Sequence, residues 1–212
     1  MERSQSYIEN HSTLSDAVLD AVERWAHLYT AQPQMLCGRY VGRMLTMVCE
    51  MLDARIVIEV GAFIGYSAIC LARGLSEGGM LHSFEVNDEY KDAFLRHVGS
   101  AGVGDRVSLH IGDALETLPK FLGDGVTVDV AFIDAGKRNL MDYYEMLVPR
   151  MRKGGMIVVD NVMWGGKVLD LEKNKDRDTQ IINDFNDFVT ADPRVENLMM
   201  DVRDGLMFCR VL

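Results

Sequence analysis

Three side chains with oxygen donors follow two short apolar runs of this chain. Asp134 comes directly after Val128–Ile133, and Asp160 and Asn161 close the run that begins at Met156. If the two runs are adjacent parallel strands, their carboxyl ends lie at one edge of a sheet, where α/β proteins bind ligands. Two carboxylates held together without a basic partner either bind a cation or have raised pKa values. Three oxygen ligands suit a Mg²⁺-like ion that retains some water, although each residue alone could equally be a helix cap or begin a turn.

The elements that must position these residues alternate between short apolar runs and longer helical segments. Near-continuous apolar runs separated by helices indicate a parallel sheet covered on both faces. The predicted strands are Ile56–Val60, Met80–Val86, Arg106–Ile111, Val128–Ile133 and Met156–Asp160. The predicted helices between them span about residues 65–76, 88–100, 113–122 and 137–152.

The two ends of the chain depart from this alternation. Helical segments near 12–30 and 38–52, separated at Pro33, precede the first strand. A helix near 176–190 is followed by the predicted strands Val195–Val202 and Leu206–Leu212, and Asp204-Gly205 between them is a hairpin signal. We therefore predict a single α/β domain: a doubly wound, mostly parallel sheet with an antiparallel last strand (about 55–212) and an N-terminal helical cap (about 1–54).

The charge and composition of the chain argue against nucleic acids and membranes as partners. The 212 residues carry a net charge of −10 with a pI near 4.9, whereas a broad nucleic-acid surface needs clustered Lys and Arg. We interpret the one dense basic cluster, residues 150–153, as a helix C-terminus whose charges complement the helix dipole. Four cysteines without CxxC spacing favour reduced thiols in a cytoplasmic protein. The polar N-terminus and the lack of a long apolar stretch predict neither a secretory leader nor a membrane span.

A glycine-containing turn follows the first predicted strand. Gly61 and Gly65 lie between that strand and the next helix, so the backbone could approach a ligand closely and the helix could offer free N–H groups. The spacing is not GxGxxG, which disfavours a dinucleotide. Glu85 ends the second strand, where a carboxylate could accept both ribose hydroxyls of an adenosine or could simply be solvated. Asp113 and Ala114 could border a bound adenine, or Asp113 could be only a helix N-cap.

Three motifs, taken in order, resemble those of the cation-dependent O-methyltransferases. They are Glu59-x-Gly61-x-x-x-Gly65-Tyr66-Ser67, then Phe132-Ile133-Asp134-Ala135-Gly136-Lys137, then the run from Gly154 to Trp164 that contains Asp160-Asn161. This group includes the caffeoyl-CoA O-methyltransferases, their bacterial relatives and, more distantly, catechol O-methyltransferase. The resemblance extends from about Met35 to the C-terminus. It implies a Rossmann-like methyltransferase sheet, S-adenosylmethionine (SAM) as methyl donor, a divalent cation and a homodimer.

The resemblance also implies roles for residues at matching positions. Asp134, Asp160 and Asn161 would bind the divalent cation, with Mg²⁺ expected first. Lys137 falls where the family places its general base, one helical turn from Asp134, although Lys is more often solvated. The residues that would surround SAM, from its methionine end through the ribose to the adenine, are Glu59, Gly61, Ala62, Ser67, Glu85, Asp113 and Ala114, together with Asp134.

Two positions depart from the family pattern. Gly136 stands where many members have a second Asp, which removes one cofactor contact. Gly165 follows Trp164, where the plant enzymes carry an Asn that helps to hold the substrate. We therefore expect a small catechol-like acceptor with two adjacent hydroxyls, other than caffeoyl-CoA itself. The N-terminal helices and the loop Val162–Leu171 should form its pocket.

Three other functions are compatible with parts of the sequence. Methylation of a hydroxyuridine in tRNA would use the same cation ligands, but an acidic chain offers little to a polyanion. A nicotinamide oxidoreductase would lack GxGxxG and leave Asp134, Asp160 and Asn161 without a role. A non-catalytic SAM-binding protein would have no need of Lys137. In the leading interpretation, two adjacent hydroxyls chelate the cation, Lys137 accepts a proton, and the acceptor oxygen attacks the sulfonium methyl.

Overall fold

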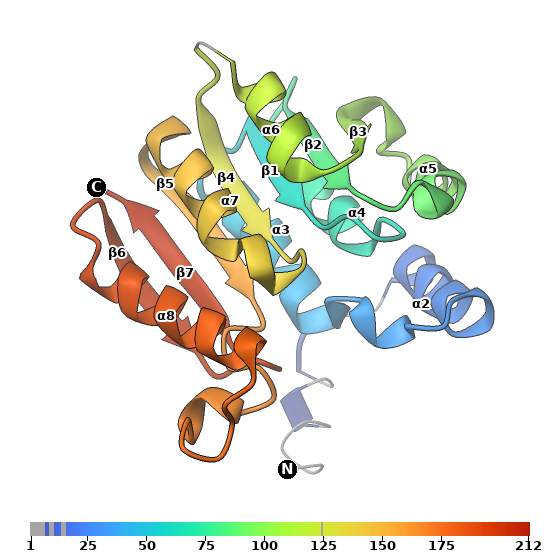
Figure 1. The fold of residues 1–212 in the computed structure, drawn as a ribbon. Coiled ribbons are helices and arrows are strands. Elements are labelled where there is room, and N and C mark those ends of the chain that lie inside the picture. Colours follow the sequence, from blue (N-terminus) through green and yellow to red (C-terminus); the bar gives the residue numbers. More distant parts are fainter. Residues whose placement is uncertain (1–6, 9–10, 14–15, 124) are drawn as a thin grey trace.

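A seven-stranded sheet forms the centre of the molecule in the computed structural model, which describes residues 7–8, 11–13, 16–123 and 125–212. The strand order is β3-β2-β1-β4-β5-β7-β6. Every pair of neighbours from β3 to β5 is parallel, whereas β7 is antiparallel to both β5 and β6 (Figure 1). The predicted sheet with an antiparallel last strand is confirmed. Its strand order reverses between β1 and β4, the position at which open α/β sheets bind ligands.

The strands agree with the prediction in number and order. Their bounds are β1 Ile56–Val60, β2 Met80–Glu85, β3 Val107–Ile111, β4 Val128–Ile133, β5 Met151–Asp160, β6 Val195–Met200 and β7 Leu206–Val211. The apolar residues of β1 and β4 are buried on both faces, as near-continuous apolar strands predict.

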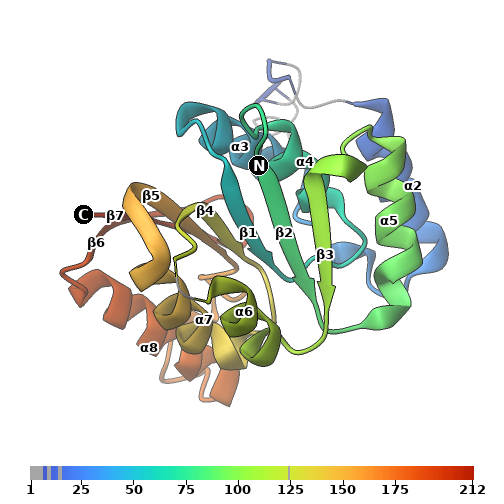
Figure 2. The same cartoon turned by 90° about the horizontal axis from the view of Figure 1, so that it is seen from above.

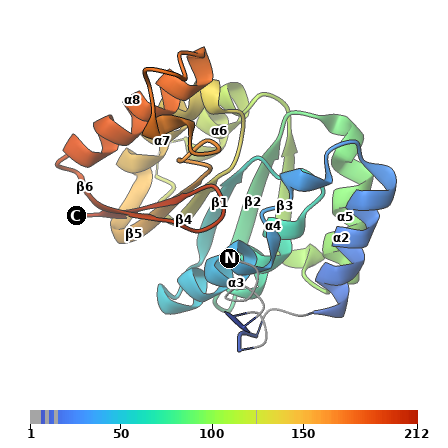
Figure 3. The same cartoon turned by 90° about the horizontal axis from the view of Figure 1, so that it is seen from below.

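Helices cover both faces of the sheet, which confirms the doubly wound arrangement. One face carries α3 Gly38–Met51, α4 Tyr66–Arg73 and α5 Lys91–Ser100, and α2 Ala17–Tyr29 lies at the edge beside α5 (Figures 2 and 3). The other face carries α6 Ala114–Leu122, α7 Leu140–Leu147 and α8 Arg177–Ala191. Two separate apolar clusters result, one on each side of the sheet.

The N-terminal helices join the core to different extents. In α3, Val41, Leu45 and Cys49 are at most 1% exposed, so this helix belongs to the core. The helix α2 packs more peripherally and is anchored at its N-cap, where the Asp16 carboxylate accepts the Val18 and Leu19 amides at 2.9 and 3.1 Å. Part of the predicted start of this helix, residues 14–15, lies outside the described residues.

The predicted helix 137–152 is wrong at both ends. A 3-10 turn, η4 Lys137–Asn139, precedes α7, and a second one, η5 Val148–Arg150, follows it. Pro149 has no N–H to continue the helical hydrogen bonds, so the chain leaves the helix there. The strand β5 therefore begins at Met151, five residues before the predicted start.

The basic cluster at residues 150–153 is likewise not a helix C-terminus. Arg152 lies in β5, where its Nε donates to Asp129 Oδ1 at 2.6 Å and its Nη2 donates to the Leu52 carbonyl at 2.6 Å. The same Asp129 carboxylate accepts the backbone amides of Arg55 and Ile56 at 2.8 Å each. Asp129 and Arg152 thus join the starts of β1, β4 and β5.

The hairpin between β6 and β7 has a five-residue connection, because Met200 pairs with Leu206. Two residues of the connection have positive φ, Arg203 at 54° and Gly205 at 82°. The Val162 and Met163 amides donate to the carbonyls of Gly205 and Asp204 at 3.2 and 2.9 Å. This long-range pairing places the hairpin connection beside the segment that follows Asn161.

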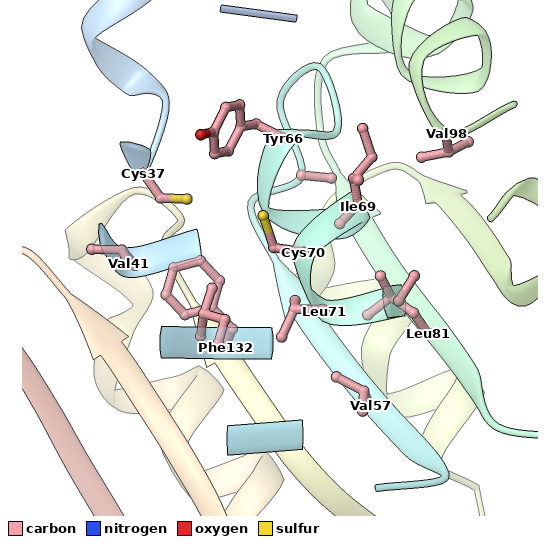
Figure 4. Close-up of a cluster of buried hydrophobic side chains, with 14 of the residues drawn as sticks. Cys37, Val41, Val57, Tyr66, Ile69, Cys70, Leu71, Leu81, Val98 and Phe132 are labelled. Carbon is pink, nitrogen blue, oxygen red and sulfur yellow. The ribbon is translucent and has the colours of Figure 1, made fainter. Parts of the chain in front are cut away.

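The core on the α3 side contains buried thiols as well as aliphatic side chains. Figure 4 shows Cys37 and Cys70 among Val41, Leu71 and Phe132. Every cysteine is buried and free, in agreement with the prediction of reduced thiols. Across the described residues, none of the helices is long and apolar enough to cross a membrane.

Candidate active site

A cleft of about 520 Å³ opens at the carboxyl ends of β1, β2 and β4. Six of the residues predicted to form the site line it. These are Gly61, Glu85, Asp113, Ala114, Asp134 and Lys137. The other predicted residues, which do not line the cleft, are Glu59, Ala62, Ser67, Asp160 and Asn161.

The turn after β1 requires glycine. Gly61 has φ 96°, and a Cβ there would lie 2.6 Å from the Asp134 carbonyl oxygen. Its amide donates to the Phe84 carbonyl at 2.9 Å. Gly65 also has a positive φ, 91°, and is the N-cap of α4. The backbone of β1 can therefore pass directly beside the end of β4, which leaves the cleft open above Gly61.

Glu85 holds the wall of the cleft opposite β4. Its Oε2 accepts the Phe63 amide at 2.7 Å, and its Oε1 accepts the Asn87 amide at 2.9 Å. The residue is 9% exposed, which contradicts the alternative of a solvated strand end. Each carboxylate oxygen keeps a second lone pair, so the carboxylate could still accept the two hydroxyls of a ribose.

Asp113 and Ala114 lie at the start of α6 on the same side of the cleft. Asp113 is the N-cap of α6, because its Oδ1 accepts the Leu115 amide at 2.9 Å. The cap interpretation is therefore confirmed, and the residue also lines the cleft. Ala114 is small and buried, which leaves room for a flat ring.

Glu59, Ala62 and Ser67 form the layer behind the turn. All three are buried, and Glu59 is completely so. The Ser83 hydroxyl donates to Glu59 Oε2 at 2.6 Å, while Oε1 has no hydrogen-bond partner among the described residues. Burial raises the pKa of Glu59 to about 8, and the hydroxyls of Ser67 and Ser83 oppose this rise. An orphaned buried carboxylate oxygen suits a cationic or N–H group of a bound molecule.

The carboxylates predicted to bind a cation end two paired strands. Ile133 pairs with Val159, so Asp134 and Asp160 follow at neighbouring positions of β4 and β5. Asp160 is 3% exposed, and its Oδ1 accepts the Asn161 amide at 2.7 Å. Asn161 has φ 60°, a left-handed conformation that Asn adopts more readily than most residues.

Lys137 reaches these carboxylates. Its Nζ donates to the Asp160 carbonyl at 2.9 Å and lies 3.6 Å from Asp134 Oδ1. It is 7% exposed, so the solvated-lysine alternative is wrong. The condition considered from sequence, two carboxylates without a basic partner, therefore does not hold, because the Lys137 amine lies beside them.

Electrostatics at this rim favour protons or cations. Burial raises the pKa of Asp134 to about 7; Lys137 opposes the rise, Asp160 adds to it, and Arg203 opposes it. Burial also raises the pKa of Asp160, again against Lys137 and Arg203. In the described part of the chain, no three His, Cys, Asp or Glu side chains form a group that could hold a metal. The predicted ligand set contains only two such residues, with the Asn161 amide as its third member.

Sequence reasoning missed several residues of the cleft. Aromatic side chains form much of its wall, namely Phe63, Phe84, Tyr143 and Trp164. Trp164 was part of a motif without a role, and its Nε1 is buried without a partner among the described residues. In the sequence, aromatic residues that line a cleft cannot be distinguished from aromatic residues of the core, because both are apolar.

Known proteins share both the sequence and the fold of this chain. A family model described as O-methyltransferase matches residues 9–212. Caffeoyl-CoA O-methyltransferase 1 of Eucalyptus globulus is 32% identical over 176 residues, which are 80% of this chain and 72% of that protein. Flavonoid 3',5'-methyltransferase of Vitis vinifera is 31% identical over 179 residues, covering 81% of this chain and 76% of that protein.

Two solved structures extend the similarity to almost the whole chain. The O-methyltransferase from Bacillus cereus in complex with SAH aligns with a TM-score of 0.89 and 29% identity, covering 98% of this chain and 96% of that one. TomG from Streptomyces achromogenes, in complex with SAM, aligns with a TM-score of 0.89 and 27% identity, covering 97% and 94%. The chain therefore belongs to the O-methyltransferase family, as a class I SAM-dependent O-methyltransferase similar to the caffeoyl-CoA O-methyltransferases.

Proposed function

We propose that this enzyme methylates one hydroxyl of a small aromatic acceptor with two adjacent hydroxyls, and that it requires a divalent cation. The supporting observation is that Asp134, Asp160 and Asn161 follow one another at the ends of the paired strands β4 and β5, with the Lys137 amine 3.6 Å from Asp134. A site that only bound SAM would need neither this donor set nor a buried lysine.

The cleft fits SAM along its length. Glu85 would accept the ribose hydroxyls, and Asp113 with Ala114 would border the adenine, since all three line the cleft. The methionine end would lie along the turn that begins at Gly61. Glu59 lies behind that turn and does not line the cleft, so it would act on SAM through the turn without touching it.

The donor set fits a hard divalent cation such as Mg²⁺, because carboxylate and amide oxygens are its preferred protein ligands. Bound there, the cation would polarise the acceptor hydroxyls, and SAM would supply the methyl group. Lys137, in its neutral amine form, would accept the proton of the reacting hydroxyl at Nζ. Its bond to the Asp160 carbonyl aims the amine at the rim, and its burial excludes water from the proton transfer.

An aromatic acceptor suits the walls of the cleft. Met35, Tyr143 and Trp164 line it, and such side chains pack against a flat ring. Met35 precedes α3 and Trp164 follows β5, which agrees with the predicted pocket between the N-terminal helices and the loop Val162–Leu171. Two adjacent hydroxyls could fill two open positions on a cation held by three protein groups, whereas one hydroxyl could not.

The competing proposal, methylation of a hydroxyuridine in tRNA, finds less support. The net charge of −10 opposes phosphate binding. Within the basic cluster, Arg152 is already paired with Asp129 and the Leu52 carbonyl.

The test is methyl transfer from labelled SAM by enzyme stripped of metal and then resupplied with Mg²⁺. We expect a catechol to be methylated only with the cation, a monohydroxy analogue far more slowly, and tRNA carrying hydroxyuridine not at all. SAH binding, measured by calorimetry, should survive the removal of metal. Full turnover in excess EDTA would contradict the cation requirement, and incorporation into tRNA with every catechol inert would favour the competing proposal.

Homodimer formation and a cytoplasmic location stay predictions. Apolar side chains on α3 support the first, because Met47 and Met51 are 49% and 72% exposed. Light scattering on the wild type and on Met51→Glu would show whether this face is an interface. A monomeric wild type would contradict the prediction.

A further inference from the structure

A second cavity, of about 580 Å³, adjoins the cleft on the side of the N-terminal helices. The turn η1 Pro33–Met35 separates the two, because Met35 lines the cleft while Leu36 lines the cavity. The opposite wall comes from the β6–β7 connection through Arg203. Its polar lining consists of Glu23, His27, Arg39, Tyr40, Tyr66 and Arg203, and Leu36 and Gly38 lie beside Arg203.

Arg203 is held in place at a conformational cost. Its φ of 54° is uncommon for a long side chain, and such a conformation costs on the order of 1 kcal/mol. Its Nη1 donates to the Leu36 carbonyl at 2.7 Å. A Cβ on Gly38 would lie 2.7 Å from the same nitrogen, so the guanidinium occupies space that glycine leaves free. A well-placed arginine in a conformation that glycine would adopt more easily suggests a function for the side chain.

The charge of Arg203 is not neutralised locally. Across the residues that the structure describes, no ion pair joins Arg203 to a carboxylate, whereas Arg39 lies 3.2 Å from Asp20 and 3.3 Å from Glu23. The connection that carries Arg203 lies beside the segment that follows Asp160 and Asn161, because the Val162 and Met163 amides donate to the Gly205 and Asp204 carbonyls at 3.2 and 2.9 Å. A positive charge therefore stands between the cavity and the rim.

Tyr66 adds a neutral hydrogen-bond donor to the same cavity. It is 2% exposed, and among the described residues its hydroxyl has no hydrogen-bond partner. Figure 4 shows the hydroxyl directed away from α4, toward the segment that carries Cys37. A buried hydroxyl without a partner is costly, and an oxygen of a bound molecule would satisfy it.

We propose that this cavity binds a carboxylate carried by the methyl acceptor, with Arg203 as the residue that selects for it and the Tyr66 hydroxyl as a second donor. The inference rests on the proposed function, because it specifies the acceptor further, as a catechol that carries an acidic side group. An arginine presents a planar pair of N–H donors that matches a carboxylate, and Nη1 alone is engaged by Leu36. The acceptor would place its hydroxyls at Asp134 and Asp160 and its carboxylate beyond η1.

The experiment compares each acidic catechol with its neutral amide, which has nearly the same shape. The probes are protocatechuate and the longer caffeate, each with its amide. Two readouts are used: kcat/KM with SAM and Mg²⁺, and calorimetric binding to the SAH complex without metal. We expect the wild type to prefer the acid of at least one pair by about 10- to 100-fold, the usual value of hydrogen bonds to a charged group.

Arg203→Gln should abolish this preference, and Arg203→Gly should do the same while relieving the backbone strain at φ 54°. Arg203→Gly therefore separates loss of recognition from failure to fold. Arg210→Gln is the matched control, because Arg210 lies on β7 and pairs with Glu196 at 2.6 Å, away from the cavity. Tyr66→Phe should weaken binding of the preferred acid about 2- to 10-fold, as expected for a neutral donor.

The proposal fails if the wild type does not distinguish the acids from the amides, or if both Arg203 variants keep the preference. If Tyr66→Phe binds the acids as tightly as the wild type, the hydroxyl is not part of the site. The two readouts separate this inference from the proposed function. An enzyme that binds the acids through Arg203 but methylates no catechol would contradict the proposed function alone.

Discussion

Replacing Glu85 should weaken cofactor binding and the fold together. A simply solvated carboxylate, which the sequence left open at this position, would contribute little to the fold. Glu85 is instead 9% exposed and accepts two backbone amides, Phe63 at 2.7 Å and Asn87 at 2.9 Å. The Phe63 bond joins the cofactor turn to the end of β2, 22 residues away in sequence.

The two substitutions at this position have different expected magnitudes. In Glu85→Gln, the side-chain oxygen can still accept one of the two backbone N–H groups. The side-chain NH2 group is itself a donor, so the second backbone N–H loses its acceptor. Leaving one buried amide unpaired should lower the free energy of unfolding by about 1–3 kcal/mol. Glu85→Ala leaves both unpaired and should cost about twice that. Loss of the charged acceptor for the ribose should weaken SAH binding by about 1.5–3 kcal/mol, roughly 10- to 150-fold, in either variant.

Calorimetry with SAH and urea unfolding of the same preparations measure the two effects. Glu116→Gln provides the control, because Glu116 is exposed on α6, away from the cleft lining. The assay temperature should lie well below the unfolding transition of the least stable variant. SAH affinity of Glu85→Gln within twofold of the wild type would place the ribose elsewhere, and unchanged stability of Glu85→Ala would show that the two amides find other partners.

Three further predictions concern the rim, the layer behind the turn and the base of the sheet. Lys137→Ala should lower kcat by about 10²–10⁴ with SAH affinity unchanged, as expected for a positioned general base; near wild-type single-turnover rates would contradict that role. Because the pKa of Glu59 is raised to about 8, its contribution to stability is fully present below its unfolded pKa near 4.5 and is lost as the pH rises to 8. Glu59→Gln should therefore gain stability relative to the wild type between pH 5 and 8, and parallel pH profiles in thermal unfolding would refute this. Asp129→Ala removes the acceptor of the Arg55 and Ile56 amides and of Arg152 and should lower the free energy of unfolding by about 2–4 kcal/mol. Urea unfolding against Asp105→Ala, on a short exposed turn, would test this.

Local pattern was sufficient for the sheet and for the polar residues at the ends of its strands. Short apolar runs such as Ile56–Val60 and Val128–Ile133, separated by helical segments, predict parallel strands that are buried on both faces, and the structure buries them in this way. Once the strands are parallel neighbours, the residues that end them meet at one edge. Asp134, Asp160 and Glu85 could therefore be placed from sequence alone, because chain direction and strand pairing determine where a strand ends.

Boundaries and side-chain partners needed the tertiary structure. The helix predicted to reach residue 152 ends near Pro149, because Met151 and Arg152 pair with β4 and Asp129 instead of continuing the turn. Local helix propensity carries no information about whether a segment continues a helix or pairs with a distant strand. Lys137 could be placed one turn from Asp134, but its burial and its bond to the Asp160 carbonyl depend on how η4 packs against β5.

Arg203 illustrates what sequence could not reveal about the site. It follows Asp160 by more than 40 positions, in a hairpin connection that the sequence marks only as a turn. Its guanidinium reaches the Leu36 carbonyl, 167 residues earlier in the chain, because the β6–β7 connection folds back beside the segment after Asn161. Strand order and the pairing of loops set that proximity. Residue types and spacing along the chain determined the chemistry available to this protein, and packing between distant segments decided which charged side chains face each other.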